Sequence, residues 1–179
     1  MTPLLPGEKI ECKHVTLEVH HMPGHTPGLS CLFEPDHRLL FSADHLLEHV
    51  SPNPLIDLRP EGEPPSFKPL VTYFESLDRV RKLGVNLVLP GHATPFGNCR
   101  NVIDSLSVFY ERRQTKLLDA LKRKPLTVYQ AMRELFPAGE AFELILMISE
   151  TLGNLELLED RRKIKREIDS DFIRFRLKG

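Results

Sequence analysis

Several features that would assign a protein to a specialised class are missing from this 179-residue sequence. It has no tryptophan, and its three cysteines are odd in number and lack Cys-x-x-Cys spacing, so we expect neither a disulfide framework nor a structural zinc knuckle. No run reaches eighteen apolar residues, and the N-terminus lacks the basic-then-apolar pattern of a signal peptide. The formal net charge of −1 predicts no strong attraction to nucleic acid or anionic membranes. These absences together predict a globular, cytoplasmic protein with no membrane partner.

The first half of the chain shows the alternation of apolar and polar residues that is typical of half-buried strands. We expect one strand over residues 11–20 and two more over 29–34 and 38–42, the last two joined by a turn. Six prolines between residues 51 and 69 exclude regular structure there. Such a segment serves either as a lid over a site or as a plain surface connection, and both interpretations stay open.

A helix and a further strand follow the proline-rich segment. Apolar residues at steps of three and four predict a helix over residues 70–83, which Gly84 ends, and residues 86–89 predict a short buried strand. A helix followed by a strand is typical of α/β proteins, in which functional sites gather at strand ends.

Three polar side chains stand where the predicted strands stop. His25 lies in Gly24-His25-Thr26-Pro27-Gly28, Asp44 follows the apolar run that ends in Ser42-Ala43, and His92 ends Pro90-Gly91-His92. Histidine together with carboxylate is the ligand set of hydrolytic zinc or iron sites. The pattern makes His25, Asp44 and His92 candidates for metal ligands.

The order of these motifs resembles the second half of the metallo-β-lactamase superfamily, in its glyoxalase II-like branch. The resemblance rests on residues 22–28, 40–45 and 88–92. It implies that His25 binds a first zinc ion, that Asp44 bridges two ions and that His92 binds the second. The implied fold class is α/β (α+β), with half of an αββα sandwich. The implied activity is hydrolysis of an ester, thioester or phosphoester by zinc-activated water, with no catalytic residue assigned in this chain.

The other signature of that family, His-x-His-x-Asp-His, does not occur in these residues. In the family it supplies two ligands to each metal ion, so we expect this chain alone to be inactive and to hold zinc weakly or not at all. Half of the sandwich would also leave an apolar face uncovered, which predicts a homodimer or a swapped assembly.

The last eighty residues have a different, mostly helical pattern. Helices are expected over 102–121, 127–136 and 140–159, followed by a hairpin over 163–168 and 172–177. We place the domain boundary near residues 98–105, giving a half metallo-β-lactamase domain over 1–100 and a winged-helix-like domain over 101–179. The resemblance supports this division, because one subgroup of the family carries a C-terminal winged helix.

The third of these helices does not favour nucleic-acid binding. It contains no lysine or arginine between residues 141 and 158, and it carries the glutamates Glu140, Glu143, Glu150, Glu156 and Glu159. Such a surface would repel phosphates. We therefore expect this helix to pack against the catalytic domain or another subunit rather than to bind DNA. As the substrate, a small-molecule ester or thioester is favoured over RNA.

Two rival interpretations remain. His45-Leu46-Leu47-Glu48-His49 matches the inverted zinc-protease motif, but that motif needs a helix and Pro52 and Pro54 follow closely. The alternative to a hydrolase is a non-catalytic interaction module that keeps the ligand turns only as scaffold.

Overall fold

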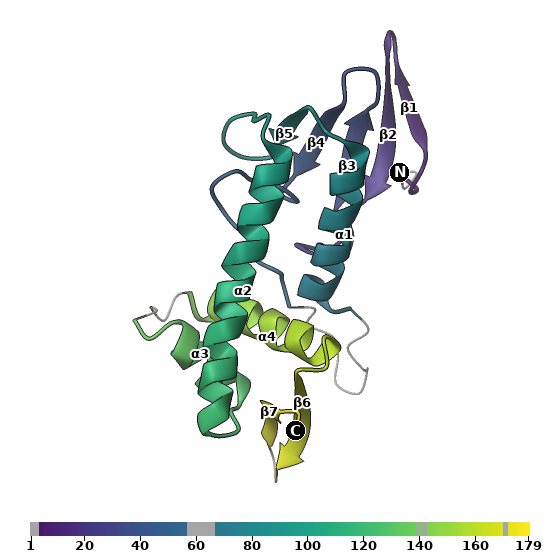
Figure 1. The fold of residues 1–179 in the computed structure, drawn as a ribbon. Helices are drawn as coiled ribbons and strands as arrows, with labels where there is room; N and C mark the ends of the chain where they lie inside the picture. Colours follow the sequence, from purple (N-terminus) through teal and green to yellow (C-terminus); the bar gives the residue numbers. More distant parts are fainter. Residues whose placement is uncertain (1–3, 57–66, 139, 141–142, 170–171) are drawn as a thin grey trace. The chain divides into compact units, whose positions relative to one another are not determined.

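The computed structural model describes residues 4–56, 67–138, 140, 143–169 and 172–179. Contacts divide the chain into two compact units, each made of two segments (Figure 1). Unit 1 consists of Met1–Pro52 and Thr72–Leu106, and unit 2 of Asn53–Val71 and Ser107–Gly179. The domain boundary near residues 98–105 stays a prediction. In the structure each compact unit also takes a segment from the other side of that boundary or of the proline-rich stretch.

Unit 1 is built on a single sheet of five strands in the order of the chain. The strands are β1 (Lys9–Cys12), β2 (Val15–His21), β3 (Ser30–Glu34), β4 (Leu39–Ala43) and β5 (Leu87–Pro90). Neighbouring strands pair antiparallel, except that β4 and β5 run parallel. Because β4 and β5 run parallel, their C-terminal ends lie at the same end of the sheet, which brings the turns after them close together.

The predicted single strand over residues 11–20 is wrong, because the chain reverses within it. Lys13 adopts a positive φ of 49°, and Cys12 pairs with Val15 across the turn. The apolar and polar residues continue to alternate through the tight turn, so the sequence pattern alone did not reveal the hairpin.

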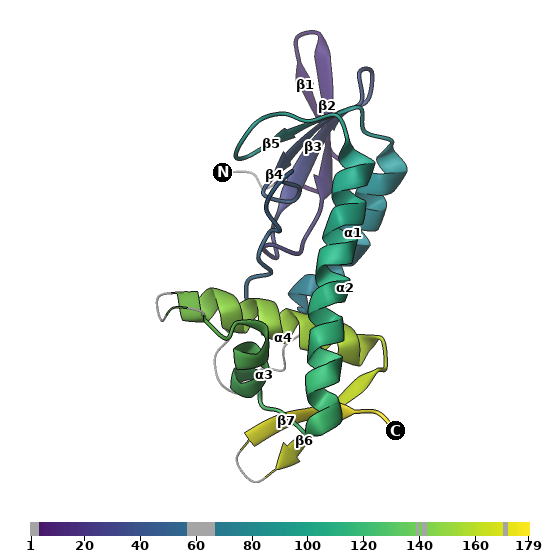
Figure 2. The same ribbon diagram turned by 60° about the vertical axis from the view of Figure 1, so that its left-hand side comes forward.

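Two helices cover one face of this sheet, as Figures 1 and 2 show from two directions. They are α1 (Pro69–Leu83), of which residues 72–83 belong to unit 1, and the beginning of α2 (Cys99–Arg123). Leu40 and Val88, paired in β4 and β5, are fully buried on the sheet. Gly84 ends α1 with a φ of 65°, as the sequence predicts.

Unit 2 contains the rest of α2, two further helices and a hairpin. These are α3 (Val128–Leu135), α4 (Leu144–Asp160), β6 (Ile164–Asp169) and β7 (Phe172–Leu177). Thr127 and Gln130 form a reciprocal capping box that fixes the start of α3. The start predicted for the third helix includes residues 141–142, which lie outside the described residues.

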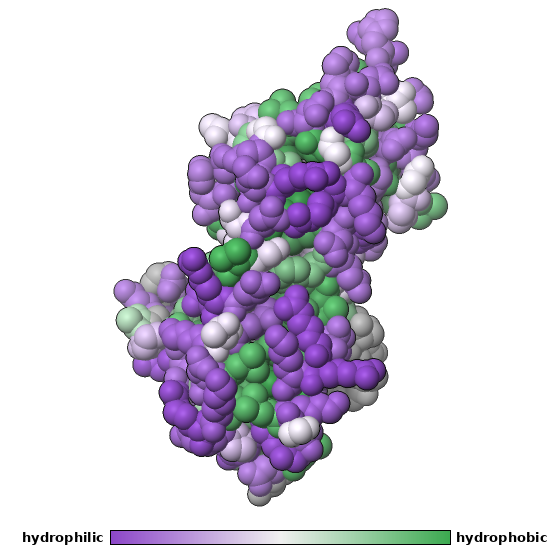
Figure 3. Space-filling model, viewed as in Figure 1, coloured by the Kyte–Doolittle hydropathy of each residue, from purple (hydrophilic) through white to green (hydrophobic). Residues whose placement is uncertain are grey.

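The core of unit 2 brings together all of its elements. Leu117 and Leu121 of α2, Leu155 and Leu158 of α4 and Phe175 of β7 are almost completely buried in one cluster. The unit also carries apolar side chains on its surface, and Figure 3 shows them gathered in patches among hydrophilic ones. In the described parts of the chain, no helix combines the length and the apolar character needed to cross a membrane.

The proline-rich segment is described only at its two ends. Residues 57–66 lie outside the described residues, and residues 51–56 form neither helix nor strand. Within unit 2, Asn53 Nδ2 donates to the Leu146 carbonyl, and the Ser149 hydroxyl donates to the Pro54 carbonyl. Gly153 lies so close to Pro54 that an added Cβ would approach its Cγ to 3.2 Å. The first residues of the segment are therefore fastened to α4, whichever of the two predicted roles the remainder has.

Candidate functional site

His25 is held by a turn that packs directly on α1. The turn is closed by hydrogen bonds from Met22 N to the Leu29 carbonyl and from Gly24 N to the Thr26 carbonyl. Gly24 has a φ of 150°, and a Cβ placed on it would lie 2.5 Å from Tyr73 Cβ. Only glycine fits between the turn and the helix, so the close packing of Gly24 fixes where His25 stands.

Asp44 follows β4 where the strand loses its regular register. The pairing of β4 with β5 is irregular between Phe41 and Ala43, and Ala43 has a positive φ of 45°. Gly91 N donates to the Ala43 carbonyl at 2.9 Å, which joins the end of β4 to the turn after β5. This bulge directs the Asp44 side chain toward the Pro90-Gly91-His92 turn.

Gly91 provides the space that the Asp44 carboxylate occupies. A Cβ at this position would lie 2.9 Å from Asp44 Oδ1 and 3.2 Å from the Ala43 carbonyl carbon. The glycine before His92 is thus required by close approach, not by an unusual φ. A glycine directly before a proposed ligand suggests in the sequence that the turn is crowded. The sequence does not show that the Asp44 side chain is the group that approaches Gly91.

The two predicted histidines converge on the Asp44 carboxylate. His92 Nε2 lies 3.3 Å from Asp44 Oδ1, and His25 Nε2 lies 4.0 Å from Asp44 Oδ2. Each imidazole therefore faces a different oxygen of the same carboxylate. The His25 side chain is 23% exposed and that of His92 is 76% exposed, so water and small molecules reach the cluster in the described part of the chain.

The three side chains do not surround a single point. Among the described residues, no group of three or more His, Cys, Asp or Glu side chains is arranged to hold a metal ion. Asp44 instead divides its two oxygens between two histidines, which gives two pairs that share one carboxylate.

His45 supports the loop after Asp44 from inside unit 1. Its side chain is completely buried and packs edge-on against the Tyr73 ring, with 5.2 Å between ring centroids. Burial, aided by the charge of Arg79, lowers the pKa of His45 to about 4, so the ring is neutral at neutral pH. The Tyr73 hydroxyl donates to the His45 carbonyl at 3.0 Å. Sequence reasoning did not find this supporting role, because burial of a histidine beside a ligand leaves no pattern.

The inverted zinc-protease interpretation of residues 45–49 does not fit the structure. These residues form no helix, His45 is buried, and the His49 side chain is 80% exposed beside Glu48. A histidine inside the core and one in solvent cannot bind one ion through one helix face.

Comparison with known proteins places these motifs in a family. Residues 2–92 match the sequence profile of the metallo-beta-lactamase superfamily. The chain is 35% identical to the probable metallo-hydrolase YqjP of Bacillus subtilis (strain 168) over 146 residues, which are 82% of this chain and 46% of YqjP. It is 34% identical over 98 residues to the acyl-coenzyme A thioesterase MBLAC2 of Homo sapiens, covering 52% of this chain and 32% of that protein.

Solved structures agree with the sequence comparison. A beta-lactamase domain protein from Burkholderia ambifaria superposes with a TM-score of 0.87 at 28% identity, over 99% of this chain and 52% of that one. A metallo-beta-lactamase family protein from Thermus thermophilus superposes with a TM-score of 0.80 at 29% identity, over 98% of this chain and 54% of that one. The predicted mixed α/β fold is confirmed, and the chain spans about half the length of these relatives. The chain belongs to the metallo-β-lactamase superfamily.

Proposed function

We propose that His25, Asp44 and His92 are metal ligands of a zinc-dependent hydrolase centre, with Asp44 shared between two ions. The observation that carries the proposal is that two imidazoles face opposite oxygens of one carboxylate. An ordinary ion pair needs one histidine per carboxylate, as His37 has with Glu34. Two histidines on one aspartate at the ends of parallel strands are better explained by ligation of two cations.

The separations between the ligand atoms in the structure support this assignment. Two ligand atoms about 2.0–2.1 Å from one tetrahedral zinc ion lie roughly 3.3–3.4 Å apart. The distance of 3.3 Å from His92 Nε2 to Asp44 Oδ1 agrees with that value, and the 4.0 Å from His25 Nε2 to Asp44 Oδ2 needs only a small closure. Neutral nitrogen and carboxylate oxygen are also the donors that zinc prefers in catalytic sites.

The chain's own residues would hold and orient the centre. Bound zinc supplies polarisation of a substrate carbonyl and a water molecule with a pKa near ~7. Asp44 would fix the positions of the two histidines relative to each other through its two oxygens. The backbone at Gly91 would hold the Asp44 carboxylate in place. Tyr73 and the buried His45 would prevent the loop after Asp44 from moving away.

A thioester or another small ester is the substrate class that we favour. MBLAC2, which covers about half of this chain, is named an acyl-coenzyme A thioesterase. The glyoxalase II-like assignment from the sequence motifs points to the same class of bond.

The isolated chain is proposed to bind zinc weakly and to be inactive. Two protein ligands per ion are fewer than the three that catalytic zinc sites use, and the affinity depends strongly on the number of bonds. Zinc content after dialysis should fall far below one ion per chain. Stoichiometric zinc that survives dialysis would reject this part of the proposal.

A zinc titration followed by imidazole resonances tests the ligand assignment itself. We expect His25 and His92 to respond at lower zinc concentrations than His37 and His49. The last two are matched controls, because each lies beside a single carboxylate of its own, at 3.1 Å and 3.4 Å. If all four histidines respond together, the shared-carboxylate site does not exist.

Association through the uncovered face of the sheet is a second part of the proposal. Phe41 is 41% exposed, and its strand neighbours Leu32 and Leu89 share its face by register. We propose that a second copy of the chain covers this apolar face, because the relatives are about twice as long and this chain carries only half of their length.

We further propose that residues 101–179 form a winged helix whose third helix, α4, packs rather than binds DNA. Within unit 2, Glu150 forms an ion pair with Arg113 at 3.0 Å, and Glu159 is bound by Arg166. Side chains used in this way support packing inside the unit.

A further inference from the structure

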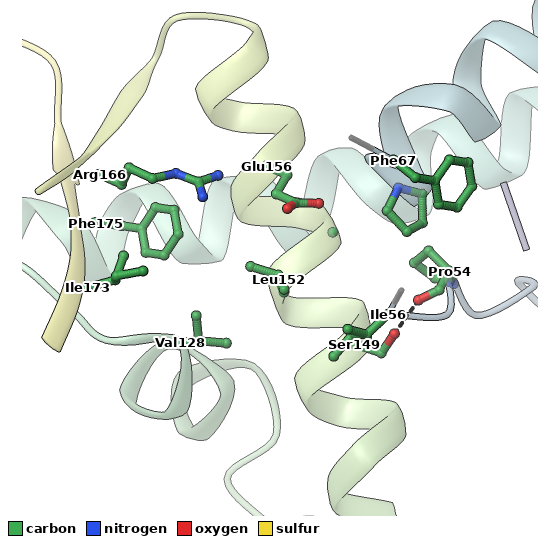
Figure 4. A pocket seen from close by; sticks show the side chains of 12 residues that line it. Pro54, Ile56, Phe67, Val128, Ser149, Leu152, Glu156, Arg166, Ile173 and Phe175 are labelled. Atoms are coloured by element: carbon green, nitrogen blue, oxygen red, sulfur yellow. Dashed lines mark hydrogen bonds between the residues drawn. The ribbon is translucent and has the colours of Figure 1, made fainter. Parts of the chain in front are cut away.

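Unit 2 contains a cavity that is separate from the Asp44 cluster and belongs entirely to that unit. Its volume is about 240 Å³, and its walls come from α3, α4, the β6–β7 hairpin and the described ends of the proline-rich segment (Figure 4). An engineered cavity of about 150 Å³ holds a benzene molecule. By that comparison, the cavity has room for about ten non-hydrogen atoms.

Most of the cavity wall is apolar. Pro54, Phe67, Leu152, Ile173 and Phe175 surround it, and Figure 4 shows Leu152 and Phe175 on opposite elements with open space between them. Such a lining favours a hydrocarbon or an aromatic ring over a sugar or a phosphate.

Glu156 is the exception in this apolar surrounding. It lies on α4 facing the cavity, and only 5% of its surface is exposed. Its carboxyl group makes no hydrogen bond and no ion pair with any other residue that the structure describes. Desolvation in these surroundings raises the pKa of the Glu156 carboxyl group to about 6, so a ligand that supplied a donor to this group would gain from the contact.

The cations near Glu156 already have other partners. Arg166 binds Glu159 through Nε at 2.9 Å to both oxygens and lies over the Phe175 ring at 5.5 Å. Lys68 pairs with Asp160 at 3.5 Å. These two pairs are close to neutral, so among the described lining residues Glu156 carries the negative charge that no neighbouring cation pairs with directly.

From this arrangement we propose that the cavity binds a small aryl- or alkylamine. Its apolar body would fill the space beside Leu152 and Phe175, and its ammonium group would donate to the Glu156 carboxylate. The same carboxylate would repel carboxylate and phosphate ligands of equal size. This site is distinct from the proposed hydrolase centre and does not depend on it.

Titration of the full chain with 2-phenylethylamine, followed by backbone amide resonances, tests the proposal. We expect saturable shifts in unit 2, with at least tenfold weaker binding of phenylacetate, which has the same ring and the opposite charge. Glu156→Gln should weaken binding of the amine at least tenfold. Glu111→Gln is the matched control, because Glu111 is exposed on α2 and outside the cavity, and it should leave the affinity unchanged.

A second variant locates the binding independently of charge. Ile173 lines the cavity and is 50% exposed, so Ile173→Trp should fill the space without disturbing the core, and should abolish the shifts. The proposal is overturned if the amine does not saturate, if phenylacetate binds equally well, or if either cavity variant binds like the wild type.

Discussion

Replacing Glu156 by glutamine should stabilise the chain at neutral pH but not in acid. The carboxyl group is buried and has no partner among the described residues. Burial raises its pKa from 4.5 to about 6, with the charges of Arg166 and Lys68 opposing part of the rise. The folded state therefore binds this proton more tightly than the unfolded state.

The sign and size of the effect follow from linkage. Below pH 4.5 the group is protonated in both states and costs nothing, whereas above its folded pKa of about 6 it must be buried as an anion. The free energy of unfolding thus falls as the pH rises through this window, by about 2 kcal/mol. Glutamine does not ionise, so Glu156→Gln lacks this fall.

Urea unfolding followed by far-ultraviolet circular dichroism is the assay, because the chain has no tryptophan for fluorescence. The stability difference between variant and wild type should be about 2 kcal/mol larger at pH 7.5 than at pH 4.5. Comparing this stability difference at two pH values cancels any pH-independent cost of burying the glutamine side-chain amide. The same measurement on Glu111→Gln, at an exposed glutamate of α2, serves as the control. A difference that does not change with pH would refute the account of the cavity carboxyl group.

Three further substitutions test the packing around the candidate site and the proposed association. Gly24→Ala should lower the free energy of unfolding by about 3 kcal/mol, because the added Cβ would overlap Tyr73 and Gly24 has a positive φ. Urea unfolding measures this loss, and a near-neutral effect would contradict the close packing. Gly91→Ala should displace the Asp44 carboxylate and weaken zinc binding at least about tenfold by calorimetry, whereas unchanged affinity would show that the carboxylate does not need this space. Phe41→Lys should convert a dimer to a monomer in light scattering, and a wild-type chain that is already monomeric at micromolar concentration would rule out the proposed association.

Much of the fold was predictable, because its signals are local. The apolar period of α1 and its end at Gly84, and the capping residue Thr127 before α3, mark elements without reference to the rest of the chain. The hairpin at Lys13 was missed because alternation continues through a tight turn. The grouping of residues 53–71 with unit 2 depends on contacts such as Asn53 with Leu146, which are far apart in sequence, so no local pattern encodes it.

The sequence indicates which side chains of the candidate site lie near one another, but not what surrounds them. His25, Asp44 and His92 each follow a strand, and strand ends meet at one edge of a sheet. The burial of His45 and the space at Gly91 depend on the distance between turns, which no local pattern encodes.

The glutamates of the third predicted helix show the same limit. The sequence suggests an exposed acidic surface, yet Glu156 lines an internal cavity and Glu150 is largely buried beside Arg113. Helical periodicity identifies which residues share a face, but only the packed unit decides which face is covered.

Anomalous diffraction at the zinc edge, from crystals of the chain soaked in zinc, tests the central claim most directly. The shared-carboxylate account predicts two peaks about 3.5–4 Å apart, one between Asp44 and His25 and the other between Asp44 and His92. Peaks only at surface histidines such as His49, with none beside Asp44, would contradict it.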